Sequence, residues 1–260
     1  MSLPSKLSGK RALVTAGAPG IDLTLRSELL AAGCDVFVHY YRSADAAKAL
    51  AAEAAKLGRR CASASADLTT SEECERLVAE AVVFLGGLDI LVNNAGTMVE
   101  KLSRADGSDD FWAETMSLNM GGMRRVTRAA TPHLAVAART GGGASIINMS
   151  SVAGRKGGAP GTLAYSTAKG ATLAFSRALA EELGPQGIRV NAISPGLILG
   201  SQFHVTHTKA EAIPGIVAGI PLGRPGTTED VARATVFLAA EFDGFITGAT
   251  LDINGGAYRA

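Results

Sequence analysis

The sequence predicts an α/β protein in which one doubly wound parallel sheet of about seven strands carries helices on both faces. Short apolar runs alternate with longer segments of helical spacing along the chain, which is typical of repeated β–α–β units. The apolar runs are nearly continuous, as expected for strands buried on both faces of a sheet. A glycine-rich turn, TAGAPG, separates the first apolar run from the first helical segment.

Each expected element follows from its local pattern. In chain order, RALVT (11–15), DVFVHY (35–40), DILVNN (89–94), SIINMS (145–150) and RVNAIS (189–194) are the strongest strand candidates. CASASA (61–66) is a weaker candidate, and ATLDI (249–253) completes the sheet. Helical spacing with few internal glycines or prolines predicts helices over residues 23–32, 44–57, 71–85, 111–134, 165–183 and 229–239. Residues 197–227 form the longest stretch without a clear pattern, and long loops of this kind are commonly functional.

Composition and charge limit the classes of function. The chain has 260 residues, of which 47% are hydrophobic and 19% charged, and no linker divides it, so we expect one domain spanning 1–260. A net charge of +1 leaves no basic footprint for nucleic acid or an anionic membrane. Neither a membrane-spanning apolar run nor an apolar signal segment is visible, which predicts a cytoplasmic protein. Cys34, Cys61 and Cys74 lack the spacing of metal ligands, so we expect reduced thiols and no metal site.

The turn TAGAPGID (15–22) has the outline of a dinucleotide-binding loop. Glycines after the first strand let the backbone approach a pyrophosphate, and N–H groups at the start of the next helix bind it. Asp22 stands where such a loop usually has its last glycine. An acid near a helix N-terminus is favoured by about 0.3–1 kcal/mol, yet a carboxylate that faces the pyrophosphate repels it. The sequence leaves both orientations of Asp22 open.

The end of the second strand indicates which dinucleotide is bound. An acid there would bond the ribose 2′-hydroxyl of NAD, whereas a basic residue would accept the 2′-phosphate of NADP. The strand ends in HYYRS (39–43), which offers Arg42 and Ser43 but no acid, although Pro19 gives the glycine-rich loop no basic partner. We therefore expect NADP(H) as the cofactor, with NAD(H) as the alternative.

A serine, a tyrosine and a lysine form the strongest candidate for chemistry. Ser151 follows a strand, Tyr165 comes 14 residues later, and Lys169 follows Tyr165 by four residues in YSTAK. On a helix, residues four apart share a face, so the ammonium lies near the phenol. A fixed cation stabilises a phenolate, and we therefore expect the pKa of Tyr165 to fall from about 10 toward neutrality. Ser151 could then hold a substrate oxygen while Tyr165 transfers a proton to it.

Together with other motifs, these residues resemble the short-chain dehydrogenase/reductase family, whose NAD(P)-binding sheet is of the Rossmann type. The resemblance runs from about residue 7 to residue 258. It rests on NNAG (93–96), SLNMGG around Asn119, NMSSVAG around Ser151, YSTAK (165–169), PG (195–196) and Asp67 in ADL, in the family's order. Such a resemblance implies hydride transfer between a nicotinamide and a carbonyl or alcohol group.

The resemblance also implies roles for individual residues. Tyr165 would be the general acid or base, Ser151 would orient the substrate oxygen, and Lys169 would lower the pKa of Tyr165 and hold the nicotinamide ribose. Asn119 would anchor a water that links Lys169 to solvent. The implied cofactor-binding residues are Thr15, Gly17, Gly20, Ile21, Arg42, Ser43, Asp67, Leu68, Asn94, Ala95, Gly96, Tyr165, Lys169, Pro195 and Gly196.

Two positions depart from the family pattern and support a rival hypothesis. Besides Asp22, Gly200 stands where family members usually carry a threonine that touches the nicotinamide or phosphate, with Ser201 as a candidate substitute. Weakened cofactor contacts at both positions would suit a cofactor-impaired member that keeps the fold as a binding protein. The complete catalytic set favours an enzyme instead.

We expect a small substrate, and the balance of loop charges favours an anionic one; charges that are simply solvated at the surface are the alternative explanation. Segments expected above the strand ends carry Lys101, Arg104, Arg155, Lys156, His204, His207 and Lys209, against Glu100 and Glu211. His204 and His207 suit a mobile lid better than a metal pair, because no third ligand is nearby. The stretches SQFH, GIPLGRPGTTEDVA and GFITGATLDINGGAYRA are similar to reductases of keto-deoxy uronic acids from alginate; a 3-oxoacyl thioester is the alternative substrate.

The resemblance implies a homo-oligomer as well. Members of the family are usually tetramers whose interfaces include the helix expected over 165–183 and the C-terminal segment. Leu173, Phe175 and Leu179 give that helix apolar positions, which a role in the core explains equally well.

Overall fold

A computed structural model of the chain describes residues 7–15, 20–41, 54–102, 107–240 and 244–260. The described strands form one parallel sheet of seven in the order β3-β2-β1-β4-β5-β6-β7. The strands are β1 (Arg11–Thr15), β2 (Asp35–Tyr40), β3 (Cys61–Ser65), β4 (Ile90–Asn93), β5 (Ala144–Met149), β6 (Ile188–Pro195) and β7 (Thr250–Ile253). The predicted doubly wound sheet is confirmed, and β1 and β2 have the predicted bounds.

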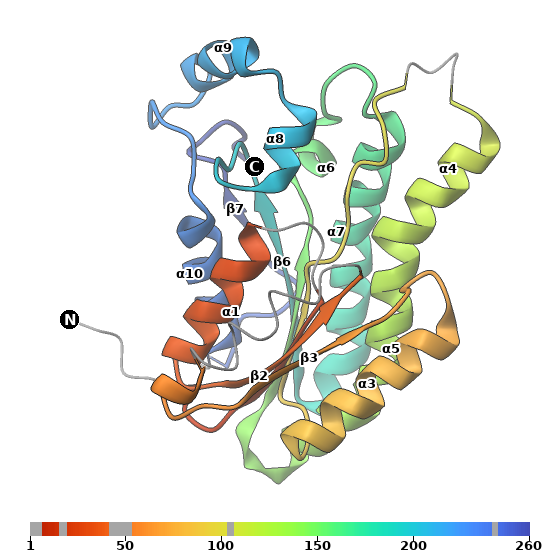
Figure 1. Cartoon of the computed structure of the whole chain (residues 1–260), viewed down its shortest axis with the longest axis vertical. Coiled ribbons are helices and arrows are strands. Elements are labelled where there is room, and N and C mark those ends of the chain that lie inside the picture. Colours follow the sequence, from red (N-terminus) through yellow and green to blue (C-terminus); the bar gives the residue numbers. More distant parts are fainter. Residues whose placement is uncertain (1–6, 16–19, 42–53, 103–106, 241–243) are drawn as a thin grey trace.

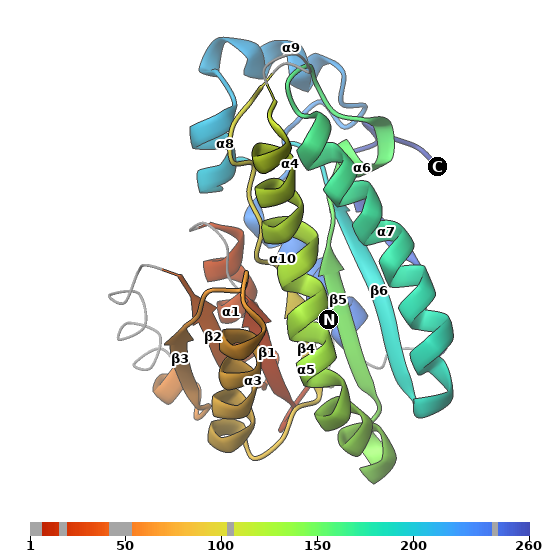
Figure 2. The same ribbon diagram turned by 90° about the vertical axis from the view of Figure 1, so that its right-hand side faces the viewer.

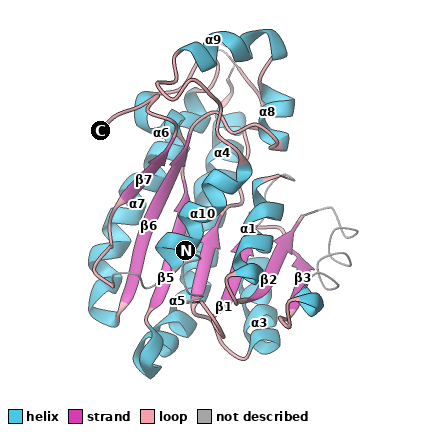
Figure 3. Ribbon diagram, turned by 90° about the vertical axis from the view of Figure 1, so that its left-hand side faces the viewer, coloured by secondary structure: helices cyan, strands magenta, loops and turns pink. Residues whose placement is uncertain are grey.

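Helices cover both faces of the sheet (Figure 1). Helices α1 (Ile21–Ala31) and α10 (Thr228–Ala239) pack against each other on one face, as Figure 3 shows from their side. The opposite face carries α3 (Ser71–Leu85), α5 (Gly122–Ala137) and α7 (Leu163–Leu183), which are seen in front of the strands in Figure 2.

Shorter helices gather beyond the carboxyl ends of the strands. Helix α6 (Val152–Lys156) follows β5, and α8 (Gln202–His207) and α9 (Ile213–Ala218) follow β6 at the top of Figure 2. The expectation that 197–227 lacks regular structure is therefore wrong: short polar segments such as QFHVTH make one or two helical turns, too short for a periodic signal. The 3₁₀ turns are Gly184–Gln186 and Ala210–Ala212. Most of the helix expected over 44–57 lies outside the described residues.

The helix expected over 111–134 is a longer composite. It begins as α4 (Asp109–Met116), where Ser108 accepts a hydrogen bond from the N–H of Phe111, and continues through a π-helical turn, Ser117–Gly121, into α5. A second π-helical turn, Ala138–Gly142, ends it. Periodicity predicted the helix but not its widened turn, because a π turn changes the hydrogen bonding without interrupting the run of helix-forming residues.

Two apolar cores lie on the two faces of the sheet. Along β1, Ala12 and Val14 belong to the core under α1 and α10, whereas Leu13 belongs to the core under α3, α5 and α7. Successive side chains of a strand point to opposite faces, so a continuous apolar strand feeds both cores at once. Cys34 and Cys74 are buried and Cys61 is half-buried, and all three are reduced cysteines.

The strand order determines where a site can form. The chain moves outward from β1 to β2 and β3, then returns to add β4 on the other side of β1. In doubly wound sheets a reversal of this kind leaves a crevice at the carboxyl ends of the strands. The Thr15 hydroxyl accepts hydrogen bonds from the N–H groups of Asn94 and Ala95, both at 3.1 Å, and so ties the end of β1 to the segment that follows β4. No helix in the described part of the chain is long and apolar enough to cross a membrane.

Candidate active site

A pocket of about 580 Å³ lies at the carboxyl ends of β4, β5 and β6, with α8 and α9 on its outer side. Its lining joins residues distant in sequence, from the glycine-rich loop to the segment after β6. Of the predicted site residues, Ile21, Asn94, Gly96, Ser151, Tyr165, Lys169, Pro195 and Gly196 line it. The fold therefore assembles one cavity from most of the motifs that the sequence singled out.

Ser151 is placed by the end of β5 and the start of α6. It is the N-cap of α6, and its Oγ accepts a hydrogen bond of 3.1 Å from the N–H of Ala153. The neighbouring Ser150 donates its hydroxyl to the Lys169 carbonyl at 2.7 Å, which joins the strand end to α7. Gly154 is packed so closely on α7 that a Cβ there would lie 2.5 Å from the carbonyl carbon of Lys169. These contacts hold Ser151 beside α7.

Tyr165 and Lys169 lie one turn apart on α7, as predicted, and both are buried. The Lys169 ammonium donates to the Met149 carbonyl at 2.9 Å and lies 5.8 Å from the centroid of the Tyr165 ring. Burial lowers the pKa of Lys169 to about 8. Burial also raises the pKa of Tyr165 to about 12, and a hydrogen bond with Ser151 only partly opposes the rise. The expected fall of the Tyr165 pKa is thus wrong for this structure. Removal of the phenol from water raises the pKa more than the Lys169 ammonium, which is bonded to the Met149 carbonyl, can lower it.

Asn119 lies in the π-helical turn and is fully buried. Its Nδ2 donates to the carbonyls of Thr97 at 2.8 Å and Thr115 at 2.9 Å. Its Oδ1 is buried without a hydrogen-bond partner among the described residues, and a Cβ on Gly96 would lie 2.7 Å from it. The same Cβ would lie 3.1 Å from the Lys169 ammonium, and Gly96 has φ of 152°. Only glycine lets the chain pass between the amide oxygen and the ammonium.

These residues fit a nicotinamide dinucleotide. Gly20 begins α1 with φ of 132°, and no side chain caps this helix, so its first N–H groups are left for an anion. Gly96 and Gly196 line the pocket with backbone alone, and Gly96 lies against the Lys169 ammonium and the unpartnered Asn119 oxygen. Backbone N–H groups at a helix start and a buried cation are donors that suit the phosphates and ribose of a dinucleotide.

At the far end of the crevice the described residues are fewer. The Asp67 carboxylate accepts hydrogen bonds from the hydroxyl and the N–H of Thr69 at 2.7 and 2.9 Å, which lower its pKa. Leu68 is nearly buried beside it. Gly17, Arg42 and Ser43 lie outside the described residues.

The Asp22 side chain is directed along α1 and does not line the pocket. It is buried and pairs with Arg26 one turn further along the helix, Oδ2 to Nη2 at 3.7 Å, while Oδ1 has no hydrogen-bond partner among the described residues. Burial raises the pKa of Asp22, while Arg26 and backbone groups of the first turn oppose the rise. The carboxylate is thus turned toward Arg26 and not into the pocket.

Gly200, the second departure, has a conformational explanation. Its φ of 83° lies in the left-handed region, where a β-branched threonine is strained. The neighbouring Ser201 is buried, lines the pocket and donates its hydroxyl to the Ile198 carbonyl at 2.9 Å. A hydroxyl thus remains at this wall, one residue later in the chain.

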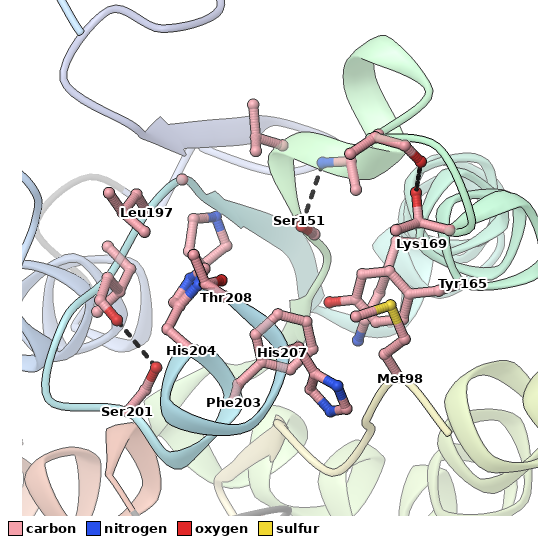
Figure 4. Close-up of a pocket in the computed structure, with 18 of the residues that line it drawn as sticks. Met98, Ser151, Tyr165, Lys169, Leu197, Ser201, Phe203, His204, His207 and Thr208 are labelled. Atoms are coloured by element: carbon pink, nitrogen blue, oxygen red, sulfur yellow. Dashed lines mark hydrogen bonds between the residues drawn. The ribbon is translucent and has the colours of Figure 1, made fainter. Parts of the chain in front are cut away.

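Helix α8 brings an aromatic side chain that sequence reasoning missed. The Phe203 ring lies 5.5 Å from the Tyr165 ring and 5.0 Å from the His207 ring, measured between centroids (Figure 4). His204 hydrogen-bonds the Thr208 hydroxyl through Nδ1 at 2.9 Å, and burial lowers its pKa. The only sequence signal was an aromatic residue within a polar segment after PG, which is too common to assign a role.

The ionisable residues of the pocket are nearly all basic. Lys101, Lys156, Lys169, His204, His207 and Lys209 line it together with Tyr165, whereas no Asp or Glu of the described part of the chain does. The expectation that Arg155 faces the substrate is wrong, because Arg155 donates to both carboxylate oxygens of Asp252, at 3.1 and 2.9 Å. Arg104 is not among the described residues. No group of three or more His, Cys, Asp or Glu that could hold a metal occurs in the described ranges.

Comparison with known proteins adds independent evidence. A family model described as enoyl-(acyl carrier protein) reductase matches residues 17–258. The chain is 34% identical over 252 residues to the 3-oxoacyl-[acyl-carrier-protein] reductase FabG of Haemophilus influenzae, covering 97% of this chain and 99% of that protein. A crystal structure of the NADH-dependent reductase A1-R′ with NAD matches at a TM-score of 0.88 and 31% identity, covering 99% of this chain and 100% of that one. That reductase is described as responsible for alginate metabolism. A short chain dehydrogenase of Burkholderia cenocepacia with NADP matches at 0.87 and 32% identity, covering 97% and 99%.

Proposed function

The chain belongs to the short-chain dehydrogenase/reductase family, and on that premise we propose that it reduces the carbonyl group of a small organic acid with NADPH. Membership makes it an NAD(P)-dependent oxidoreductase. One observation carries the finer proposal: Ser151, Tyr165 and Lys169 share a pocket whose other ionisable lining residues, among those described, are all basic.

Each residue of the site has a distinct role in the proposed reduction. Bound NADPH supplies a hydride to the carbonyl carbon. Tyr165 gives its phenolic proton to the carbonyl oxygen, so that the product is an alcohol and a phenolate remains on Tyr165. Ser151, which lines the pocket beside Tyr165, holds the same oxygen in line. General acid catalysis of this kind contributes roughly 10²–10⁴ in rate.

The protonation state of Tyr165 is compatible with this direction. A phenol whose pKa is raised to about 12 carries its proton at neutral pH and is ready to act as an acid. The Lys169 cation, 5.8 Å from the ring centroid, stabilises the phenolate that forms. The unpartnered Oδ1 of Asn119 is available to accept a hydrogen bond from a water or from the ammonium when the proton is replaced.

The proposal favours NADP(H) over NAD(H). In the described part of β2 the last residues, His39 and Tyr40, include no acid that would bond a ribose 2′-hydroxyl, and His39 is buried with Nε2 on the Ala66 carbonyl at 2.9 Å. The sequence then offers Arg42 and Ser43 for a 2′-phosphate. Comparing kcat/KM for NADPH and NADH tests this, and a clear preference for NADH contradicts it.

A keto sugar acid is the substrate class that the pocket supports best. Its basic lining suits a carboxylate, and the A1-R′ reductase of alginate metabolism has the same fold. A 3-oxoacyl thioester is the second candidate, because the relative from Haemophilus influenzae acts on that class. NADPH oxidation measured with keto uronates, their methyl esters and 3-oxoacyl thioesters separates the two. Turnover confined to thioesters or neutral ketones overturns the keto-acid proposal.

The mechanism is tested by Tyr165→Phe, which keeps the ring and removes the proton. We expect turnover to fall by roughly 10²–10⁴ while NADPH binding, followed by its fluorescence, stays near that of the wild type. Tyr258→Phe removes a phenol outside the pocket and is the matched control. Near-normal turnover of Tyr165→Phe refutes the assignment.

Assembly and location follow from the family alone. We propose a homotetramer in the cytoplasm, with α7 and the C-terminal segment at the interfaces. Light scattering coupled to size exclusion measures the mass in solution, and a monomeric mass contradicts the tetramer.

A further inference from the structure

Lys101 connects three segments that enclose the pocket. It lies in the loop between β4 and α4, and the N–H of the next residue, Leu102, donates to the Gly161 carbonyl before α7 at 3.2 Å. Its own ammonium donates to the carbonyl of His207, the last residue of α8, at 2.5 Å. One side chain thus joins the β4–α4 loop, itself bonded to the segment before α7, to the helix that carries Phe203.

The contact with α8 is favourable for two reasons. The last carbonyls of a helix have no partner within the helix, and a cation there is stabilised by the helix dipole. A lysine ammonium has three N–H donors, of which the His207 carbonyl takes one. Lys101 also lines the pocket, so its other two donors are available to a ligand there.

Closure of α8 has a direct consequence for Tyr165. With α8 in this position the Phe203 ring packs on the Tyr165 ring, and Tyr165 is buried. Movement of α8 away from Lys101 would carry Phe203 with it and admit water to the phenol. The latch, defined as the bond from Lys101 to the His207 carbonyl, therefore controls the environment of the proton donor.

We propose that Lys101 is a specificity-determining residue that binds the carboxylate of the substrate while it holds α8 over Tyr165. This inference rests on the proposed reduction of an organic acid. The bond from Lys101 to His207 is exposed, so water competes for the ammonium and the latch alone is weak. A carboxylate bound in the pocket attracts the Lys101 ammonium and keeps it in position to donate to the His207 carbonyl. Binding of a negatively charged substrate and closure of α8 therefore stabilise each other.

Other lysines of the pocket lack this double role. Lys156 lies on α6 and Lys209 follows α8, and for neither does the described part of the chain provide a hydrogen bond across the pocket. Among the described lysines that line the pocket, Lys101 alone has an ammonium bonded to α8.

The experiment compares Lys101→Met, Lys101→Arg and Lys56→Met in the full-length enzyme with NADPH. Lys56 is exposed and outside the pocket, so its loss controls for net charge. Each enzyme is assayed with a keto uronate and with its methyl ester, and hydrogen exchange of residues 202–208 is measured with and without the acid. For Lys101→Met we expect about a 10- to 100-fold fall in kcat/KM for the acid and a much smaller fall for the ester. Exchange in 202–208 should be faster than in the wild type, and Lys101→Arg should restore both properties.

The outcomes separate the two proposals. Equal losses on acid and ester overturn the coupling between substrate charge and closure, and unchanged exchange in 202–208 overturns the latch. If the wild type reduces the ester or a thioester but not the acid, the proposed substrate class fails. If the wild type reduces the acid and Lys101→Met does so equally well, only the role of Lys101 fails.

Discussion

Gly154→Ala tests whether the close packing of α6 on α7 holds the active site together. A Cβ at this position would lie 2.5 and 2.6 Å from the carbonyl carbon and oxygen of Lys169 and 2.7 Å from the N of Gly170. All three are backbone atoms, so no side-chain rotation relieves the overlap and α6 must move. Overpacking of this kind costs about 1–3 kcal/mol. At about 2–4 °C per kcal/mol for a chain of this size, the melting temperature should fall by about 2–12 °C.

Activity should fall further than stability. Ser151 begins α6 and Lys169 lies on α7, so separating these helices moves two residues of the site apart. A misplacement of about 1 Å can cost roughly 100-fold in rate. The matched control is Gly170→Ala across the same contact, where an added Cβ meets only the Gly154 carbonyl oxygen at 3.4 Å. Thermal melting and kcat are measured for both variants. A Gly154→Ala enzyme that melts and turns over like the wild type refutes the reasoning.

Three further predictions follow from buried charges. Asp22→Asn should leave the NADPH affinity nearly unchanged, because the carboxylate faces Arg26; about tenfold tightening in a fluorescence titration would contradict this. Burial lowers the pKa of Lys169 from 10.5 to about 8, so between these values the unfolded chain binds more protons than the folded one. The free energy of unfolding of the wild type, minus that of Lys169→Met, should therefore rise between about pH 8 and pH 10.5 when both are measured by urea unfolding. A fall of this difference with pH would refute the prediction. Arg155→Gln should lower the melting temperature by breaking the pair with Asp252 yet keep the preference for acid over ester, since Arg155 does not line the pocket. Loss of the preference for acid over ester would show that Arg155 does contact the substrate.

The sheet and most of the pocket could be predicted because their signals are local. Each strand is a short apolar run, and each motif follows a strand end, so the topology alone brings Asn94, Ser151 and Gly196 to one edge. Tyr165 and Lys169 needed only helical spacing to be placed together.

Interactions between distant segments could not be predicted in this way. Arg155 is paired with Asp252, 97 residues later, and no pattern within either segment indicates the partner. The latch from Lys101 to His207 spans 106 residues and uses a backbone carbonyl, which carries no sequence signal at all. The raised pKa of Tyr165 depends on burial to which Phe203 contributes, and burial is a property of packing. Asp22 was ambiguous because two local effects of similar size opposed each other, and its pairing with Arg26 decided the matter.

The π-helical turn between α4 and α5 fixes the length of the chain at this point. A π turn contains one residue more than an α turn, and each residue of a helix rotates its neighbours by about 100°. Deleting a single residue from Ser117–Gly121 would restore a regular helix and leave the mutual orientation of α4 and α5 nearly unchanged, but it would turn the residues within the turn by up to that angle. The Asn119 amide would then leave the carbonyls of Thr97 and Thr115, although every remaining residue type was conserved. Substitutions should be tolerated around this turn far better than insertions or deletions.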